Sequence, residues 1–348
     1  MNMNDSPYVR GILKVMKKQN LCSTGRNTNI ELLRLVLMIM IFFWHLIVHG
    51  IGLSGYIRAK SVDVHYYMIL FFASLFAPAV DCFIFISGYY GIKYSTKRLM
   101  LLFVMIVLAM MVVSLKYIWL DGFSLRSLDF SQQWYFMYCY LVIFMLSPFI
   151  GGGIELLSRK QLDILLGVLI GFQIYSFIRC PEYGVENLLI MYLLGGYCSK
   201  YNITLTSKKA FCLFVVSFAA VFALEFFVSQ TPIPAECRIL SYKSPLIMLM
   251  AGSLFFVFLN FKSRSIEWLN ACLRPCLFIF LLTEGIGMPL YKSVTKIFAS
   301  NFIYGIFASS GIILFCLAVG FVLDKVARYT IDIIFKNHKL RTLNEQYR

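Results

Sequence analysis

Length, composition and charge together exclude a soluble globular protein. The chain has 348 residues, of which 60% are hydrophobic and 14% charged, and its mean hydropathy is +0.77. A soluble domain has about 45–50% apolar and about 25% charged residues. The basic residues behind the net charge of +15 lie in the two terminal segments and in short connections between apolar stretches. This distribution is typical of a membrane protein, so we expect membrane lipids and not nucleic acid as a partner.

Ten apolar stretches follow one another along the chain, and a helix that spans a bilayer needs about 20 such residues. They cover residues 29–50, 67–91, 98–115, 134–151, 162–178, 185–201, 210–229, 245–261, 271–291 and 302–323. The sequence therefore predicts an all-α integral membrane protein, a bundle of about ten transmembrane helices. We expect a membrane domain at 29–323, between a basic N-terminal segment at 1–28 and a basic tail at 324–348.

The distribution of Lys and Arg predicts how this bundle is oriented. With the N-terminus inside, 22 of the 32 basic residues fall in cytoplasmic segments, nine fall on the outer side and one lies within a helix. Short loops rich in Lys and Arg stay in the cytoplasm. Both termini are therefore expected in the cytoplasm, and the protein is expected to be a multi-pass component of the cell inner (plasma) membrane.

The first stretch carries ionisable residues that a purely anchoring helix does not need. Arg34 and His45 are eleven residues apart, and eleven steps of about 100° bring two side chains to one helix face, about 16 Å apart along the axis. A charge inside the hydrocarbon costs about 2.5–3.5 kcal/mol on insertion scales. The alignment favours a polar pathway along this helix over an arginine that only extends to the interface.

Two neighbours of these residues each have two interpretations. Glu31 stands three residues before Arg34, and it pairs with Arg34, closes a capping box with Thr28, or does both. His49 stands four residues after His45, as in some metal sites, but a zinc site needs a third protein ligand and none stands nearby. We therefore expect no metal.

Polar and aromatic residues also mark the second and fourth stretches. Asp81 lies deep in the second, where an ionisable side chain is a functional hypothesis by default. Ser87 and Gly88, near the inner end of the same stretch, would allow close backbone approach or serve helix packing. Trp134 and Tyr135 open the fourth stretch on the outer side, either as part of a site or as an aromatic anchor at the membrane interface.

These segments resemble the acyltransferase-3 family of membrane O-acyltransferases. The first span of that family typically reads Asp-x-x-Arg, then ten residues, then His, and Glu31, Arg34 and His45 match it with Glu in place of Asp. The second span of the family reads like Val-Asp-Leu-Phe-Phe-Val-Leu-Ser-Gly-Tyr, which aligns without gaps onto residues 80–89. The resemblance covers residues 28–335.

Later parts of the chain continue the resemblance, with one departure. A Trp-Phe-Leu-like segment that leads to a proline is similar to residues 134–136 with Pro148, and a Phe-Leu-Leu-Gly-like motif is similar to residues 192–196. The family often has Phe-Gly-Ile-Tyr-Leu-Ile-His in a late span. Here residues 278–284 take that place, and Glu284, about eight residues from the outer end of the ninth stretch, stands where the histidine would fall.

The resemblance implies an enzyme that moves an acyl group, commonly acetyl, from acetyl-CoA or another acyl-CoA to a hydroxyl of a cell-surface or lipid-linked glycan. The donor is then a co-substrate, and no cofactor is tightly bound. Neutral histidine, with a pKa of about 6.5, suits proton removal from a sugar hydroxyl at cellular pH. Transfer through an acyl-histidine intermediate is an alternative to direct transfer. The implied site comprises the catalytic residues His45, Asp81 and Glu284, the donor-binding residues Arg34, Glu31, Ser87 and Gly88, and the acceptor-binding residues Trp134 and Tyr135.

Two other classes of protein share some of these features. A flippase or transporter of lipid-linked sugars would also place Arg, His and Asp in its spans, but it would favour inverted repeats and broken helix pairs, which the sequence does not show. A polysaccharide polymerase would need a large outer loop, and the longest outer connection, at 51–66, has 16 residues. An acyltransferase is therefore the favoured function.

Overall fold

The computed structural model describes residues 27–53, 55, 64–120, 134–179, 184–231, 239–262 and 265–346. These residues form helices joined by turns and short coils, with no strand among them, so the expected all-α architecture is confirmed. The chain divides into two compact units. One comprises Met1–Lys93 and Phe136–Asn270, and the other comprises Tyr94–Tyr135 and Ala271–Arg348.

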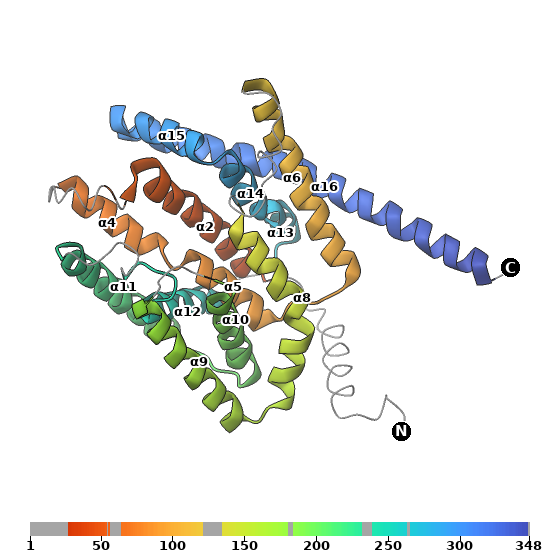
Figure 1. The fold of residues 1–348 in the computed structure, drawn as a ribbon, viewed down its shortest axis with the longest axis horizontal. Coiled ribbons are helices and arrows are strands. Elements are labelled where there is room, and N and C mark those ends of the chain that lie inside the picture. The colour runs from red at the N-terminus through yellow and green to blue at the C-terminus, as the bar shows by residue number, and fades with distance from the viewer. Residues whose placement is uncertain are drawn as a thin grey trace. The chain divides into compact units, whose positions relative to one another are not determined.

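Most helices of the first unit match an expected span. They are α2 (Thr28–His45) with its π-helical continuation η2 (Leu46–Ile51), α4 (Val64–Phe76), α5 (Ala79–Tyr90), α8 (Tyr135–Leu156), α9 (Arg159–Arg179), α10 (Val185–Lys200), α11 (Ser207–Ser229) and α12 (Pro245–Leu259). Within this unit α5 contacts both α10 and α12 (Figure 1).

The second expected span, residues 67–91, is interrupted in its middle. α4 ends at Phe76, a turn holds Ala77 and Pro78, and α5 begins at Ala79. Proline has no N–H for the helical ladder and its ring crowds the preceding turn, which explains why one continuous helix does not form. The two helices together still make a stretch, Val64–Tyr90, that is long and apolar enough to cross a bilayer.

Eight helical stretches in the described part of the chain are long and apolar enough to cross a membrane. Two further helices at expected spans are shorter, because α10 has 16 residues and α12 has 15. If α10 and α12 also cross the membrane, each must run antiparallel to the odd-numbered spans and parallel to the even-numbered spans, as an alternating ten-span path requires.

α10 runs in the direction that an alternating path requires. It is antiparallel to α9, because Tyr197 near the end of α10 donates to Asp163 near the start of α9 at 2.5 Å. It is parallel to α5, because early and late residues of the two helices meet in the same order: Asn187 donates to Asp81, and the Tyr192 backbone lies against Gly88. The sixth and second expected spans should indeed be parallel.

α12 also fits this path. At one end Asn29 at the start of α2 donates to the carbonyl of Phe261, just after α12, at 2.5 Å. At the other end the rings of Trp44 and Tyr242 have centroids 6.1 Å apart. α12 is therefore antiparallel to α2, as the eighth and first of a series of alternating spans should be.

The ten-span path with both termini in the cytoplasm predicts where reporters lie. A reporter fused after Tyr66, beyond the first crossing, should lie outside, and a reporter fused after Arg348 should lie in the cytoplasm. Paired fusions to one enzyme that is active only outside and one protein that fluoresces only inside measure the two positions. If both fusions lie on the same side, the number of spans is wrong by an odd number.

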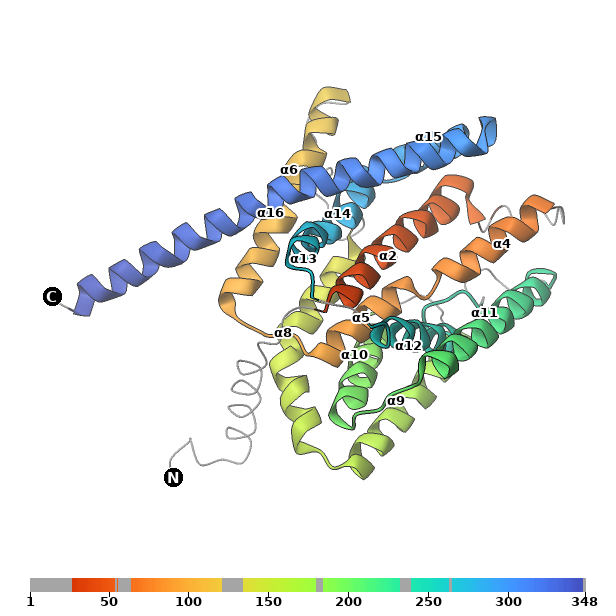
Figure 2. The ribbon, with the colours of Figure 1, turned by 180° about the vertical axis from the view of Figure 1, so that it is seen from behind.

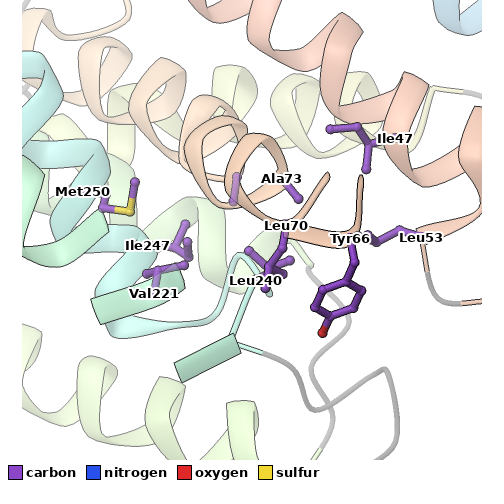
Figure 3. Packing of buried hydrophobic residues seen from close by; sticks show 10 residues of the cluster. Ile47, Leu53, Tyr66, Leu70, Ala73, Val221, Leu240, Ile247 and Met250 are labelled. Atoms are coloured by element: carbon purple, nitrogen blue, oxygen red, sulfur yellow. The ribbon is translucent and has the colours of Figure 1, made fainter. Parts of the chain in front are cut away.

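One buried apolar cluster of the first unit is built from side chains of η2, α4, α11, α12 and the residues that flank them. Figure 3 shows the buried apolar cluster, which comprises Ile47, Leu53, Tyr66, Leu70, Ala73, Ala77, Val221, Leu240, Ile247 and Met250. The Tyr66 hydroxyl pairs with the Ser229 hydroxyl, because a buried tyrosine O–H needs a polar partner. This contact and the ring pair of Phe71 and Phe218, 5.1 Å apart, hold α4 and α11 antiparallel.

After Tyr94–Tyr135, the chain returns to the second unit within α13 (Glu267–Leu273). This unit comprises α6 (Thr96–Leu120), η5 (Arg274–Cys276), α14 (Leu277–Ile286), α15 (Met288–Ser300) and α16 (Phe302–Gln346). α15 lies along the first part of α16 (Figure 2). α16 has 45 residues and is about 68 Å long, longer than a bilayer of about 40–45 Å, so the helix continues past residue 323 into the expected tail.

The expectation of one helix at 271–291 is wrong in its last part. α14 ends at Ile286 because Gly287 has φ 68° and ψ −145°, a conformation that glycine adopts at little cost. Pro289 then opens α15, as proline often does at the start of a helix. Glu284 therefore lies in the last turn of α14 and not well inside a span.

Candidate functional site

α2 begins with the charged pair that its sequence pattern predicted. Arg34 Nη1 lies 2.8 Å from Glu31 Oε1, with 29% of the arginine side chain and 7% of the glutamate side chain exposed. The ion-pair interpretation of Glu31 is therefore confirmed. The capping-box interpretation is wrong, because Asn27 caps α2 and the Thr28 hydroxyl instead accepts the Ile266 N–H at 2.9 Å.

Two histidines lie where α2 passes into η2: His45 is the last residue of α2, and His49 lies in η2. The helix is continuous from Thr28 to His45, so Arg34 and His45 do share a face, about 16 Å apart along the axis. Directly after His45 the backbone widens into the π-helical η2, and the His45 and His49 rings have centroids 5.4 Å apart. π-Helical turns are rare and are frequent at functional sites.

Three helices converge near Arg34. Ser87 on α5 donates to the Phe83 carbonyl at 3.1 Å. Tyr140 on α8 hydrogen-bonds Ser87, and the charge of Arg34 acts on Tyr140 and on Tyr90 at the end of α5. The sequence did not reveal Tyr140, because one aromatic residue in an apolar helix is typical of packing.

Gly88 allows α5 and α10 to touch through their backbones. A Cβ atom at Gly88 would overlap the Tyr192 carbonyl, and a Cβ atom at Gly195 would overlap the Phe85 carbonyl. Small residues have this role at many interfaces between transmembrane helices. Gly88 therefore serves helix packing, one of the two interpretations left open by the sequence, and its contact with the donor stays a prediction.

Gly88→Ala is expected to destabilise the protein by about 1–3 kcal/mol, the usual cost of overpacking, because the added methyl group meets backbone atoms that cannot rotate away. Gly167→Ala in α9 is the matched control, since nothing lies within 4 Å of the added Cβ atom. The control should be neutral or stabilising, because alanine favours a helix over glycine. Thermal unfolding of detergent-solubilised protein measures both variants, and equal Tm values for the two would contradict the packing role.

Asp81 faces the protein interior, with a partner that the sequence did not reveal. The side chain is fully buried in the first turn of α5. Asn187, in the first turn of α10, donates to Asp81 Oδ1 at 3.0 Å. The hydrogen bond thus goes to Asn187 and not to Arg34 or His45, and the catalytic role of Asp81 stays a prediction.

Glu284 and Trp134 lie in the second unit, each in contact with a neighbouring segment. Tyr291 of α15 donates to Glu284 Oε2 at 3.0 Å. The Trp134 indole N–H donates to the Leu281 carbonyl at 3.2 Å, and only 3% of Trp134 is exposed, which does not fit an anchor at the membrane interface. Tyr135 is 38% exposed. The predicted acceptor contacts of Trp134 and Tyr135 remain predictions.

One family of known proteins matches the part of the chain that holds the predicted site. A family model, described as an acyltransferase domain of the acyltransferase-3 type, matches residues 27–323. No curated protein and no solved structure is significantly similar to the chain. The match begins at Asn27, the residue that caps α2, and it includes every site residue that the sequence predicted.

Proposed function

Because this chain belongs to the acyltransferase-3 family of membrane O-acyltransferases, we propose that it moves an acetyl or related acyl group from acyl-CoA to a hydroxyl of a cell-surface or lipid-linked glycan. The donor is a co-substrate that is exchanged in each turnover, so no tightly bound cofactor is required. The chain is a multi-pass membrane protein. We assign it to the inner (plasma) membrane, which cytoplasmic acyl-CoA and lipid-linked glycans can both reach.

One observation supports this function best: Arg34 and His45 share one face of an uninterrupted helix. A guanidinium group binds phosphate through two parallel hydrogen bonds. Coenzyme A carries its phosphates and its thioester at opposite ends of the pantetheine arm. Arg34, paired with Glu31, therefore suits the phosphates, and His45, about 16 Å along the axis, suits the thioester. We propose that Ser87 and Gly88 of α5 complete the donor site.

In the proposed reaction His45 acts as a general base. The neutral imidazole takes the proton of an acceptor hydroxyl while the oxygen attacks the carbonyl carbon of the thioester. The carbon–sulfur bond then breaks, the new ester stays on the glycan, and the imidazolium returns its proton to the leaving thiolate. Asp81 and Glu284 orient the imidazole or the sugar hydroxyl, and Trp134 and Tyr135 contact the acceptor.

A lipid-linked-sugar transporter is the second candidate function. The break between α4 and α5 favours it, because transporters often form their substrate sites at discontinuous helices. The sequence pattern did not reveal this break. The family match supports acyl transfer over transport, and the two functions predict different products in the host cell.

A mass profile of the surface glycans of the host, with and without the gene, tests the proposal. Glycans from the deletion strain should be lighter by the mass of one acyl group at each modified position, and the wild-type gene should restore that mass. Isotope-labelled acetate in the restored peak would identify acetyl. Loss of whole glycan units from the surface would favour the transporter, and unchanged masses would contradict acyl transfer to these glycans.

A further inference from the structure

A fully buried carboxyl–amide pair joins α5 to α10. Both Asp81 and Asn187 have 0% of their surface exposed, and Asn187 Nδ2 donates to Asp81 Oδ1 at 3.0 Å. The other two oxygens, Asp81 Oδ2 and Asn187 Oδ1, are buried and have no hydrogen-bond partner among the described residues. Buried polar atoms of this kind are uncommon, and each one needs a reason.

The two helices do not depend on this pair for their contact. Gly88 and Gly195 bring the backbones of α5 and α10 together about two helical turns further along. A Cβ atom at either glycine would overlap the backbone of the other helix. The relative register of α5 and α10 is therefore set by close backbone packing, which would remain if Asp81 and Asn187 were apolar.

A purely structural role explains the pair poorly. An ionisable group deep in a membrane domain is costly, and replacing both partners of a buried hydrogen bond by apolar groups of the same shape can be nearly neutral or stabilising. Asp81 and Asn187 each lie in the first turn of their helix, where the positive end of the helix dipole favours a nearby carboxylate. Asp81 thus occupies a buried position at which the packing of α5 against α10 does not require a carboxyl group.

We propose that Asn187 is a positioning residue for Asp81, an inference that rests on the proposed acyltransferase function. The Asn187 amide N–H occupies Asp81 Oδ1 and fixes the plane of the carboxyl group. Oδ2 then remains as the acceptor for the hydroxyl or imidazole N–H that Asp81 orients during acyl transfer. Asn187 acts through Asp81 and holds no part of the donor, so its loss should slow turnover and leave donor binding unchanged.

Purified full-length protein provides the test, with acetyl-CoA as donor and lipid-linked glycan extracted from host membranes as acceptor. Wild type is compared with Asn187→Leu, with Asp81→Asn, and with the exchange variant that combines Asp81→Asn and Asn187→Asp. The exchange keeps a carboxyl–amide hydrogen bond but moves the carboxyl group from α5 to α10. Release of free thiol measures kcat and KM for acetyl-CoA, and thermal unfolding measures folding.

For Asn187→Leu we expect kcat to fall about 5- to 100-fold, as for a buried acceptor that loses its hydrogen-bond donor, with an unchanged KM for acetyl-CoA. The exchange variant should unfold at the wild-type temperature and still be as slow as Asp81→Asn. If Asn187→Leu does not fold, the exchange variant still allows the inference to be overturned. Wild-type kcat in Asn187→Leu, or near-wild-type kcat in the exchange variant, would overturn the inference alone. A wild-type protein that releases no thiol would overturn the proposed function, and this inference with it.

Discussion

His45→Ala is expected to lower acylation by about 10²–10⁴-fold, the usual contribution of a general base. A sugar hydroxyl is a poor nucleophile, so its proton has to leave as the oxygen attacks the thioester, and the variant has no group to take it. His45 is the last residue of α2 and is only partly buried, so the amount of inserted protein should not change. The acyl content of host glycans and thiol release from acetyl-CoA measure the loss.

Two further variants make this result specific. His45→Gln retains a polar side chain of similar size but cannot accept a proton, so it should be as inactive as His45→Ala. His49→Ala is the matched control, because His49 is a second histidine four residues along and the family resemblance does not include it. The control should lose much less activity. Near-wild-type acylation by well-expressed His45→Ala would contradict the mechanism and favour the transporter.

Hydrophobic length predicted where the helices lie, but not where they break. α2, α9 and α11 lie where continuous apolar runs indicated them, because a long apolar run has few alternatives to a membrane helix. The breaks at Pro78 and Gly287 depend on one or two residues, and the apolar run continues across each of them. Proline and glycine are also common inside transmembrane helices, so neither residue alone identified a break.

In the site, contacts within one helix could be predicted from the sequence, whereas contacts between helices could not. The ion pair of Glu31 and Arg34 could be predicted, because residues three apart on one helix are neighbours. Asn187 and Tyr140 could not be predicted. Asn187 contacts Asp81 although the two lie 106 residues apart in the chain, and helical periodicity relates only residues that are close in sequence. Only the packing of α10 and α8 against α5 brings such residues together, and a single sequence does not show which helices are neighbours.

Arg34→Ala is expected to raise KM for acetyl-CoA by about 10- to 100-fold, as for a lost hydrogen bond between charged groups, and to leave kcat at saturating donor nearly unchanged. The guanidinium is partly exposed, so a phosphate can reach it, and Glu31 holds it at 2.8 Å. Contact with a phosphate far from the reacting atoms contributes equally to the ground state and the transition state. Loss of such uniform binding appears in KM and not in kcat.

Arg34→Lys separates charge from geometry in the same assay. Lysine keeps the positive charge but lacks the two parallel N–H groups that match a phosphate, so KM should fall between the values for wild type and Arg34→Ala. Arg328→Ala is the matched control, since Arg328 also lies 2.8 Å from a carboxylate on its own helix and lies beyond the family match at 27–323. Its KM should equal that of wild type. A fall in kcat at unchanged KM in Arg34→Ala would assign Arg34 to the chemical step and contradict its role in holding the donor phosphate.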